Sequence, residues 1–260
     1  MALCNPNSGD KLLRQMLDKF GINLLRPPRD NIAPGDLLVG DAGGQARLGD
    51  FKVIFGLDLD IRKWTDGAPE ALTLNGSGKL ASEAGAEVGG TLMAKLGLPT
   101  GSLRGFFSSH KSTAAEISII APSRRTLGNL DAVLAKMRDA KLAVPAIYKS
   151  RPLFMITDTF SALGMRIALY DASGRKISAE AKAAGELGAK ADLKVTAEDN
   201  GDYGFRSKKP LVFGIAVREL EFGPEGVRDK LVKTVMTMRG AGQPDWQYVS
   251  KTEVFVSIED

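Results

Sequence analysis

The chain has 260 residues, of which 43% are hydrophobic and 25% are charged, and its formal net charge is +4. These proportions are typical of a soluble globular protein with enough chain to bury a core. No apolar run approaches the roughly 18 residues of a transmembrane helix, so we expect none. The single cysteine excludes an intramolecular disulfide.

The amino-terminal segment predicts an amphipathic helix over Lys11–Phe20, which Asp10 can cap and Gly21 can end. Its charged residues interrupt the apolar run that a signal peptide requires, so we expect a cytoplasmic protein. Cys4 precedes this helix. A lone cysteine beside an amphipathic helix is a candidate for S-palmitoylation, and the alternative is an unmodified thiol.

The rest of the chain predicts an α+β fold, a twisted and mainly antiparallel sheet with surrounding helices. Proline and glycine pairs break residues 21–49 into short extended pieces. Apolar residues at helical spacing predict one helix over Leu127–Leu142 and another that begins at Pro224. The predicted strands are Phe51–Ile61, Glu116–Ile120, Pro152–Thr159, Leu211–Phe222 and Trp246–Ile258.

Two long stretches, Lys79–Ile120 and Met165–Ala197, alternate small apolar residues with polar ones. Such alternation predicts strands with one apolar and one polar face, but this apolar face is rich in Ala and Gly and would make a poor core. Each stretch can supply a hairpin of two membrane-barrel strands of roughly 9–11 residues, and the alternative is a solvated surface hairpin. The positions expected to face lipid are Ala84, Ala86, Val88, Ile117, Ile119, Ile167, Leu169, Ile177, Ala179, Ala181, Ala191, Leu193 and Val195.

Patterns that indicate catalysis are nearly absent. His110 is the only histidine, and neither a Walker A loop nor a G-x-S-x-G elbow occurs. The stretches Ser108–Lys111 and Ser173–Lys176 match S-x-x-K, a pattern short enough to arise by chance. We therefore expect no catalytic residue, no metal site and no enzyme activity.

A short segment after the first helix carries a family resemblance. Gly21–Leu38 contains an extended run with Arg-Pro, then Ile-x-Pro and Leu-Leu, and Arg47–Gly49 follows it. This order resembles the start of bacterial gasdermins. The resemblance covers most of the chain, because the two alternating stretches flank a helix and a late strand over Leu211–Glu221 follows them. Cys4 also fits, since members of this family resemble one another in carrying a palmitoylated cysteine near the amino terminus.

The resemblance implies an autoinhibited pore-forming protein, with residues 1–239 as the pore-forming domain and residues 240–260 as an autoinhibitory segment. A partner protease, caspase-like in the family, would remove that segment. The cytoplasmic monomer would then become a homo-oligomeric β-barrel in the inner (plasma) membrane and kill the cell as a defence against phage. No cofactor is implied beyond palmitate on Cys4, and Lys11, Arg14 and Lys19 of the first helix would bind membrane lipids.

The loop Arg239–Pro244 is the expected cleavage site, because its small residues are typical of an exposed tip where proteolysis concentrates. The bond after Arg239, before Gly240, is the first candidate, and the bond after Met238 is the fallback. Residues 240–260 carry one lysine against four carboxylates, so their loss would raise the net charge from +4 to +7 and favour anionic lipid. The apolar residues expected to hold this segment as a latch are Trp246, Tyr248, Val254, Phe255, Val256 and Ile258.

The alternative function is that of a soluble, non-catalytic binding module that contacts nucleic acid or protein through a basic surface. Aromatic residues make up only 7% of the chain, and no Arg/Lys cluster is interleaved with them. Single-stranded nucleic acid is commonly bound by stacking on such aromatics, so we expect no nucleic-acid partner. A structural protein with a solvated surface hairpin is the third possibility.

Overall fold

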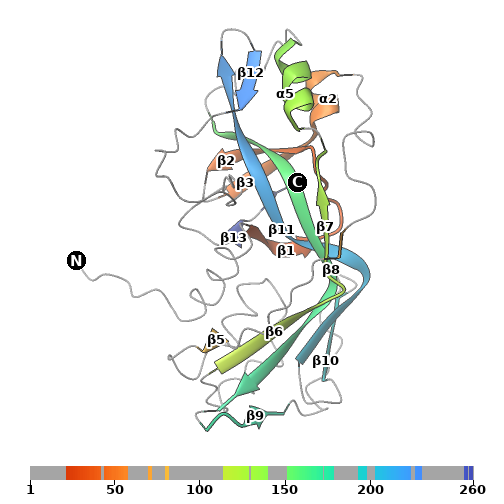
Figure 1. The fold of residues 1–260 in the computed structure, drawn as a ribbon, viewed down its shortest axis with the longest axis vertical. Helices are drawn as coiled ribbons and strands as arrows, with labels where there is room; N and C mark the ends of the chain where they lie inside the picture. The colour runs from red at the N-terminus through yellow and green to blue at the C-terminus, as the bar shows by residue number, and fades with distance from the viewer. Residues whose placement is uncertain are drawn as a thin grey trace, which may run out of the picture.

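The computed structural model describes residues 22–41, 44–57, 70–71, 80–81, 114–128, 130–139, 151–171, 173–178, 193–197, 203–223, 226–229, 255–256 and 258–259. All fourteen strands in these ranges belong to one sheet, and the helices α2 and α5 lie beside its upper part (Figure 1). The elements are β1 (Asn23–Arg29), β2 (Asp36–Asp41), β3 (Gly44–Asp50), α2 (Phe51–Phe55), β4 (Glu70–Ala71), β5 (Leu80–Ala81), β6 (Ala114–Ile120), β7 (Ser123–Thr126), α5 (Leu130–Asp139), β8 (Leu153–Tyr170), β9 (Lys176–Ile177), β10 (Leu193–Ala197), β11 (Tyr203–Gly223), β12 (Gly226–Asp229), β13 (Phe255–Val256) and β14 (Ile258–Glu259).

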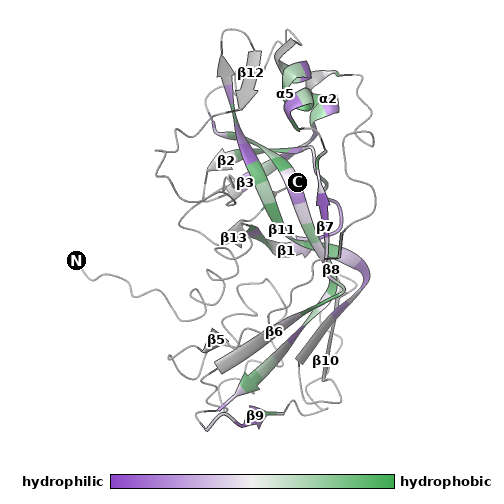
Figure 2. Ribbon diagram, in the orientation of Figure 1, coloured by the Kyte–Doolittle hydropathy of each residue, from purple (hydrophilic) through white to green (hydrophobic). Residues whose placement is uncertain are grey.

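The two long strands β8 and β11 form an antiparallel pair that runs through the whole sheet. Their register extends from Leu153 opposite Leu220 at one end to Ile167 opposite Tyr203 at the other. The main path of the sheet is β13-β1-β11-β8-β2-β3-β14, and β6, β7, β9, β10 and β12 pair with one of the two long strands outside it. Figure 2 shows hydrophobic residues along the upper halves of both long strands.

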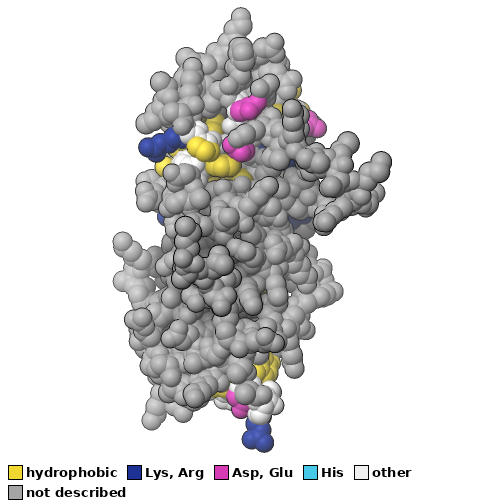
Figure 3. Space-filling view, turned by 90° about the vertical axis from the view of Figure 1, so that its left-hand side faces the viewer, with side chains coloured by type: hydrophobic (Ala, Val, Ile, Leu, Met, Phe, Trp, Pro, Cys, Tyr) yellow, Lys and Arg dark blue, Asp and Glu magenta, His cyan; other side chains and the backbone are white. Residues whose placement is uncertain are grey.

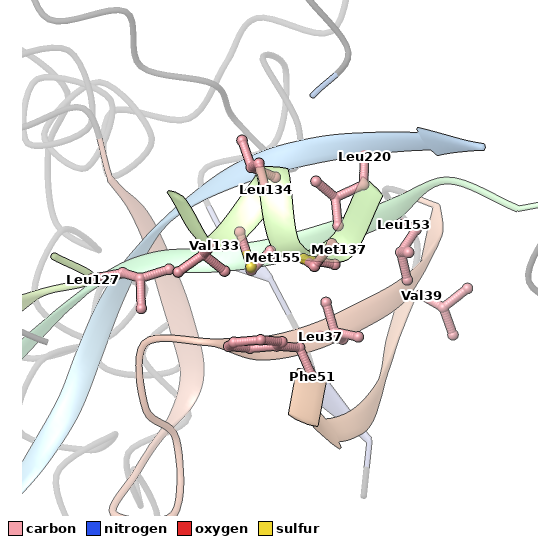
Figure 4. Close-up of a cluster of buried hydrophobic side chains, with 10 residues drawn as sticks. All are labelled: Leu37, Val39, Phe51, Leu127, Val133, Leu134, Met137, Leu153, Met155 and Leu220. Carbon is pink, nitrogen blue, oxygen red and sulfur yellow. The ribbon is translucent and has the colours of Figure 1, made fainter. Parts of the chain in front are cut away.

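The upper sheet is buried on both faces, which accounts for the unbroken apolar run Leu153–Ile156. Alternate residues of this run point to opposite faces, so Leu153 and Met155 join one cluster and Phe154 and Ile156 join the other. The first cluster lies between the sheet and the two helices (Figure 4) and consists of Leu37, Val39, Phe51, Leu127, Val133, Leu134, Met137, Leu153, Met155 and Leu220. The second consists of Leu25, Ile32, Leu38, Phe154, Ile156, Val212, Ile215, Val217 and Ile258.

The predicted strand Phe51–Ile61 is wrong at its start, where Phe51–Phe55 is the helix α2. The Asp50 carboxylate caps this helix by accepting a hydrogen bond from the Lys52 N–H at 2.8 Å. Gly56 ends it in the left-handed conformation, at a φ of 59°. Apolar content alone favoured a strand, whereas the Asp and Gly at the two ends fix a helix; residues 58–61 lie outside the described ranges.

The helix predicted from Pro224 is also wrong where the structure describes it. Gly226–Asp229 forms β12, which pairs antiparallel with the end of β11 from Gly223 opposite Gly226 to Leu220 opposite Asp229. Tertiary pairing with β11 therefore overrides the helical spacing of the apolar residues. Four other predicted elements are confirmed: β6 contains Glu116–Ile120, α5 lies inside its predicted range, and β8 and β11 extend beyond theirs. The predicted helix Lys11–Phe20 lies outside the described residues, and the predicted strand Trp246–Ile258 is described only at β13 and at the start of β14.

The helices in the described ranges include none that has both the length and the hydropathy to cross a bilayer.

Two aspartates outside the apolar clusters have shifted pKa values of opposite sign. Burial raises the pKa of Asp36 above 3.8, although the Ala33 N–H and the Arg47 guanidinium, 3.0 Å from its carboxylate, oppose that rise. Asp171, in the turn before β9, has its pKa lowered by hydrogen bonds from the Ser173 hydroxyl and from the Arg175 N–H. Figure 3 shows basic and acidic side chains at the lower end of the molecule, where Figure 1 places β9.

We expect Phe51→Ala to lower the free energy of unfolding by about 3–5 kcal/mol, because the ring is 0% exposed and its removal leaves a cavity in the first cluster. Val53→Ala in the same helix is the matched control, since Val53 is 79% exposed, and it should change stability by less than about 0.5 kcal/mol. Urea unfolding followed by circular dichroism measures both. Equal losses in the two variants would contradict the packing described for α2.

We expect Asp36→Asn and Asp171→Asn to change the pH dependence of stability in opposite directions. The raised pKa of Asp36 favours the folded state below pH 3.8, and this contribution is lost as the pH rises through the folded pKa. The lowered pKa of Asp171 gives a contribution that is present above pH 3.8 and lost as the pH falls. As the pH rises through the titration of each aspartate, Asp36→Asn should therefore gain stability relative to wild type, and Asp171→Asn should lose it. Urea unfolding at several pH values on both sides of 3.8 measures the difference in free energy of unfolding between each variant and wild type. A change of this difference in the same direction for both variants would refute the assignment.

Candidate functional site

The carboxy-terminal strands bridge the two ends of the sheet. β13 pairs in parallel with β1, with Leu24 opposite Phe255 and Leu25 opposite Val256. β14 pairs in parallel with β3, with Ile258 opposite Gln45. Without these two strands, β1 and β3 would be the ends of the main path. Because β13 and β14 are separated by one residue, a single short segment pairs with both edges and so connects the two ends of the main path.

Ile258 anchors this segment in the core. Its side chain is 3% exposed and belongs to the second cluster, with Leu25 of β1 and Leu38 of β2. The Arg29 guanidinium donates a hydrogen bond from Nη2 to the Ile258 carbonyl oxygen. Full burial of an isoleucine side chain contributes roughly 1.5–3 kcal/mol, so this one residue is a substantial part of what holds the segment.

The predicted latch residues are only partly described. Phe255 and Val256 form β13 and Ile258 begins β14. Trp246, Tyr248 and Val254 lie outside the described ranges, as do Met238, Arg239 and Gly240 at the predicted cleavage site and Cys4, Lys11, Arg14 and Lys19 at the amino terminus.

In the lower sheet, the register collects apolar positions on one face. Ile117 lies opposite Ile167, which in turn lies opposite Tyr203. Leu169 lies opposite Ile177, and Val195 lies opposite Phe205. Because side chains alternate with a period of two, one face of this sheet contains the positions Ile117, Ile119, Ile167, Leu169, Ile177, Leu193 and Val195.

All the predicted lipid-facing positions that the structure describes are therefore on this one face, which we call the apolar face of the lower sheet. The opposite face contains polar positions such as Glu116, Ser118, Arg166 and Arg206. Ala84, Ala86, Val88, Ala179, Ala181 and Ala191 lie outside the described ranges.

The ladder between β8 and β11 is interrupted halfway along. Gly164 pairs with Arg206, but the next pair joins Ala162 to Leu211, so that Ser207–Pro210 is left out of the ladder with β8. Proline lacks the N–H that a ladder requires, and extra residues of this kind bend a strand. Both long strands bend in the middle of the molecule (Figure 1).

The other side of β8 is interrupted at the same level. β6 ends with Ile120 opposite Gly164, and β7 begins with Ser123 opposite Ser161. Between them Ala121 has a φ of 48°, a conformation that is uncommon for a residue other than glycine. We call this level, where both neighbours of β8 are interrupted, the crease. It separates the two-sided core of the upper sheet from the lower sheet.

An ion pair between a buried carboxylate and a partly exposed guanidinium joins β7 to β8 just above the crease. Asp158, which is 3% exposed, accepts hydrogen bonds at Oδ1 from Arg124 Nε and Nη2 at 2.9 and 2.6 Å and from Thr126 Oγ1 at 2.8 Å. Thr157 Oγ1 donates to Oδ2 at 2.8 Å. The guanidinium of Arg124 also lies 5.5 Å from the centre of the Phe160 ring. Such multiple pairing offsets the cost of burying the carboxylate.

This polar network has no counterpart in the sequence predictions. The register pairs residues that are more than thirty positions apart, so no local spacing reveals it. The described ranges contain no group of three or more His, Cys, Asp or Glu residues that could hold a metal ion. That the whole chain has no metal site stays a prediction.

Comparison with known proteins gives the family. A model described as the Bacterial Gasdermin Family matches residues 25–232. The chain is 37% identical over 257 residues to Gasdermin bGSDM from Bradyrhizobium tropiciagri, a match that spans 99% of each chain. The chain belongs to the bacterial gasdermin family. A solved structure of a bacterial gasdermin from Bradyrhizobium tropiciagri superposes with a TM-score of 0.72 and 32% identity, covering 95% of each chain.

The gasdermin assignment made from the sequence is thereby confirmed, and so is the predicted fold class. As a member of this family, the chain is a pore-forming gasdermin. That it has no enzyme activity stays a prediction. The domain boundary at residue 239, the lipidation of Cys4 and the roles given to the cleavage, latch and membrane residues stay predictions.

Proposed function

We propose that this gasdermin is autoinhibited by residues 240–260 and is activated when a protease removes them. Residues 1–239 would then oligomerise in the inner membrane as a β-barrel pore and kill the cell during phage infection. The observation that carries the proposal is that β13 and β14 cover both ends of the sheet while Ile258 fills part of its core.

Loss of the segment would change the body in two ways at once. The main-chain groups of β1 and β3 that pair with the segment would lose their partners, and open strand edges are templates for association. The space around Leu25 and Leu38 would lose the Ile258 side chain, which exposes apolar surface. Both changes favour assembly of further copies over the monomer.

The lower sheet supports the proposal that strands enter the membrane. Along each strand, residues on the apolar face alternate with residues on the polar face. The strands of a membrane barrel have this pattern, with one face toward lipid and the other toward the lumen. A membrane tolerates no open strand edge, so the strands of one copy must continue into those of its neighbours until the barrel closes. The homo-oligomer follows from this requirement.

Several further elements of the proposal act through charge and lipid. Removal of residues 240–260 would raise the net charge from +4 to +7, and Lys11, Arg14 and Lys19 would add contacts to lipid headgroups. The crease also exposes three basic side chains, Arg206, Lys208 and Lys209, which add positive charge. Palmitate on Cys4 would add a second membrane anchor, since a single weak signal holds a protein only marginally. The activating protease would be caspase-like and cut after Arg239 or Met238.

Cleavage in the loop at residues 239–244 should release dye from vesicles. The full chain carries the recognition sequence of an unrelated protease in this loop and is cut in the presence of dye-filled liposomes of several lipid compositions. The uncut chain and the unmodified chain treated with the same protease are the controls, and neither should leak dye. Complete cleavage without leakage in every lipid composition would refute the proposed activation.

A lysine on the apolar face should block the pore, whereas a lysine on the polar face should not. Ile117→Lys places a charge at a lipid-facing position, which costs about 2–4 kcal/mol near the middle of a bilayer. Ser118→Lys is the matched control, because the next residue of β6 is on the opposite face and is exposed. Dye release after cleavage should fall in the first variant only. Thermal unfolding of the uncut chains verifies that both fold, and equal dye release from the two variants would contradict the assignment of faces.

A further inference from the structure

The edges that the carboxy-terminal segment covers form a slot with the features of a peptide-binding site. We define the tail slot as the sides of β1 at Leu24–Leu25 and of β3 at Gln45–Ala46 that β13 and β14 cover, with the core position of Ile258 and the Arg29 guanidinium. Extended peptides bind sheet edges through main-chain hydrogen bonds, and pockets for particular side chains provide specificity. The tail slot offers two strand edges and, within the second cluster, a buried position for one aliphatic side chain.

A cut in the loop at residues 239–244 breaks none of these contacts. The nearest described contact of the segment is at Phe255, well beyond the cut. Release therefore requires the segment to dissociate from the tail slot. While it is tethered, a short linker holds it at an effective concentration of millimolar order. After the cut, only the concentration of the protein itself opposes its departure.

We propose that the tail slot is a reversible binding site for an extended peptide and that a free peptide of residues 240–260 binds it in trans. Its dissociation constant lies between about 1 μM and about 1 mM. Weaker binding would leave the uncut chain open, and tighter binding would keep the cut chain closed. This range rests on the proposed activation by cleavage, whereas binding itself follows from the contacts of β13 and β14.

The identity of the peptide is specified mainly at one position. Ile258 belongs to the second cluster, as Leu25 and Leu38 do, and is 3% exposed. A shorter or polar residue there would leave a cavity or bury a polar group. The Arg29 hydrogen bond to the Ile258 carbonyl fixes the peptide lengthwise, because it contacts the main chain of the same residue. The slot therefore selects an extended segment that pairs first with β1 and then with β3 and has an aliphatic residue where the pairing with β3 begins.

The test measures binding of a fluorescent peptide of residues 240–260 by anisotropy, in lipid-free buffer. The partner is the full chain with the inserted protease site, either cut or left uncut. The cut chain should bind the peptide saturably. The uncut chain should bind it more weakly, because its tethered segment competes for the slot.

Two substitutions and two controls locate the binding. A peptide with Ile258→Ala should bind about 10- to 100-fold more weakly, which reflects the loss of the buried side chain, and this change leaves the body intact. In the chain, Arg29→Gln should weaken binding about 10-fold through loss of a charge-assisted hydrogen bond. Arg151→Gln, at an exposed position before β8, is the matched control and should have no effect. A peptide of the same composition in scrambled order should not bind.

Absence of saturable binding to the cut chain, or equal binding of the scrambled peptide, would overturn the proposal. Excess peptide added before the liposomes should also suppress dye release. Peptide binding with no dye release from wild type under any condition would refute the pore function and leave the tail slot standing. Dye release without peptide binding would refute the tail slot and leave the pore function standing.

Discussion

The continuous pairing of β8 with β11 is the constraint on which the rest of the structure depends. Their register runs from Leu153 opposite Leu220 to Ile167 opposite Tyr203, so one pair of strands serves both the upper and the lower sheet. Every strand of the lower sheet is attached directly or through one neighbour to this pair. The helices α2 and α5 cover one face of its upper part, where they contribute to the first cluster. A shift of this register by one residue would turn the alternating side chains of one long strand to the opposite face in both halves of the sheet.

The carboxy-terminal segment solves a problem that the sheet creates. A twisted sheet with two ends has two rows of unsatisfied main-chain groups, and natural proteins cover or blunt such edges. Here the cover is a segment only a few residues long. The same segment contributes to the core, because the Ile258 side chain belongs to the second cluster. Edge protection and core packing are thus combined in a part of the chain that lies close to its end. Under the proposed activation, removal of this cover would make the same edges available for association.

The sequence predicted the elements whose signals are local. The apolar run around Leu153–Ile156 and the period-2 alternation around Ile117 and Ile167 identified strands, and the register later put the alternating positions on one face. It failed at Phe51–Phe55, where the capping Asp50 and Gly56 outweigh apolar content, and at Gly226–Asp229, where pairing with β11 outweighs helical spacing. Asp158 with Arg124, and the double pairing of the carboxy-terminal segment, depend on contacts between distant residues. Local patterns contain no information about such contacts.

The crease divides the molecule into units of different cooperativity. A hydrogen-bonded ladder couples the opening of each amide to that of its neighbours, and here the ladder is interrupted on both sides of β8 at the level of Ala162–Gly164. The upper unit is held by two apolar clusters and by the Asp158 network. Below the crease the strands have one apolar face, so less buried surface opposes their local opening. Local opening of the lower sheet should therefore cost less free energy than opening of the upper unit, and it need not disturb that unit.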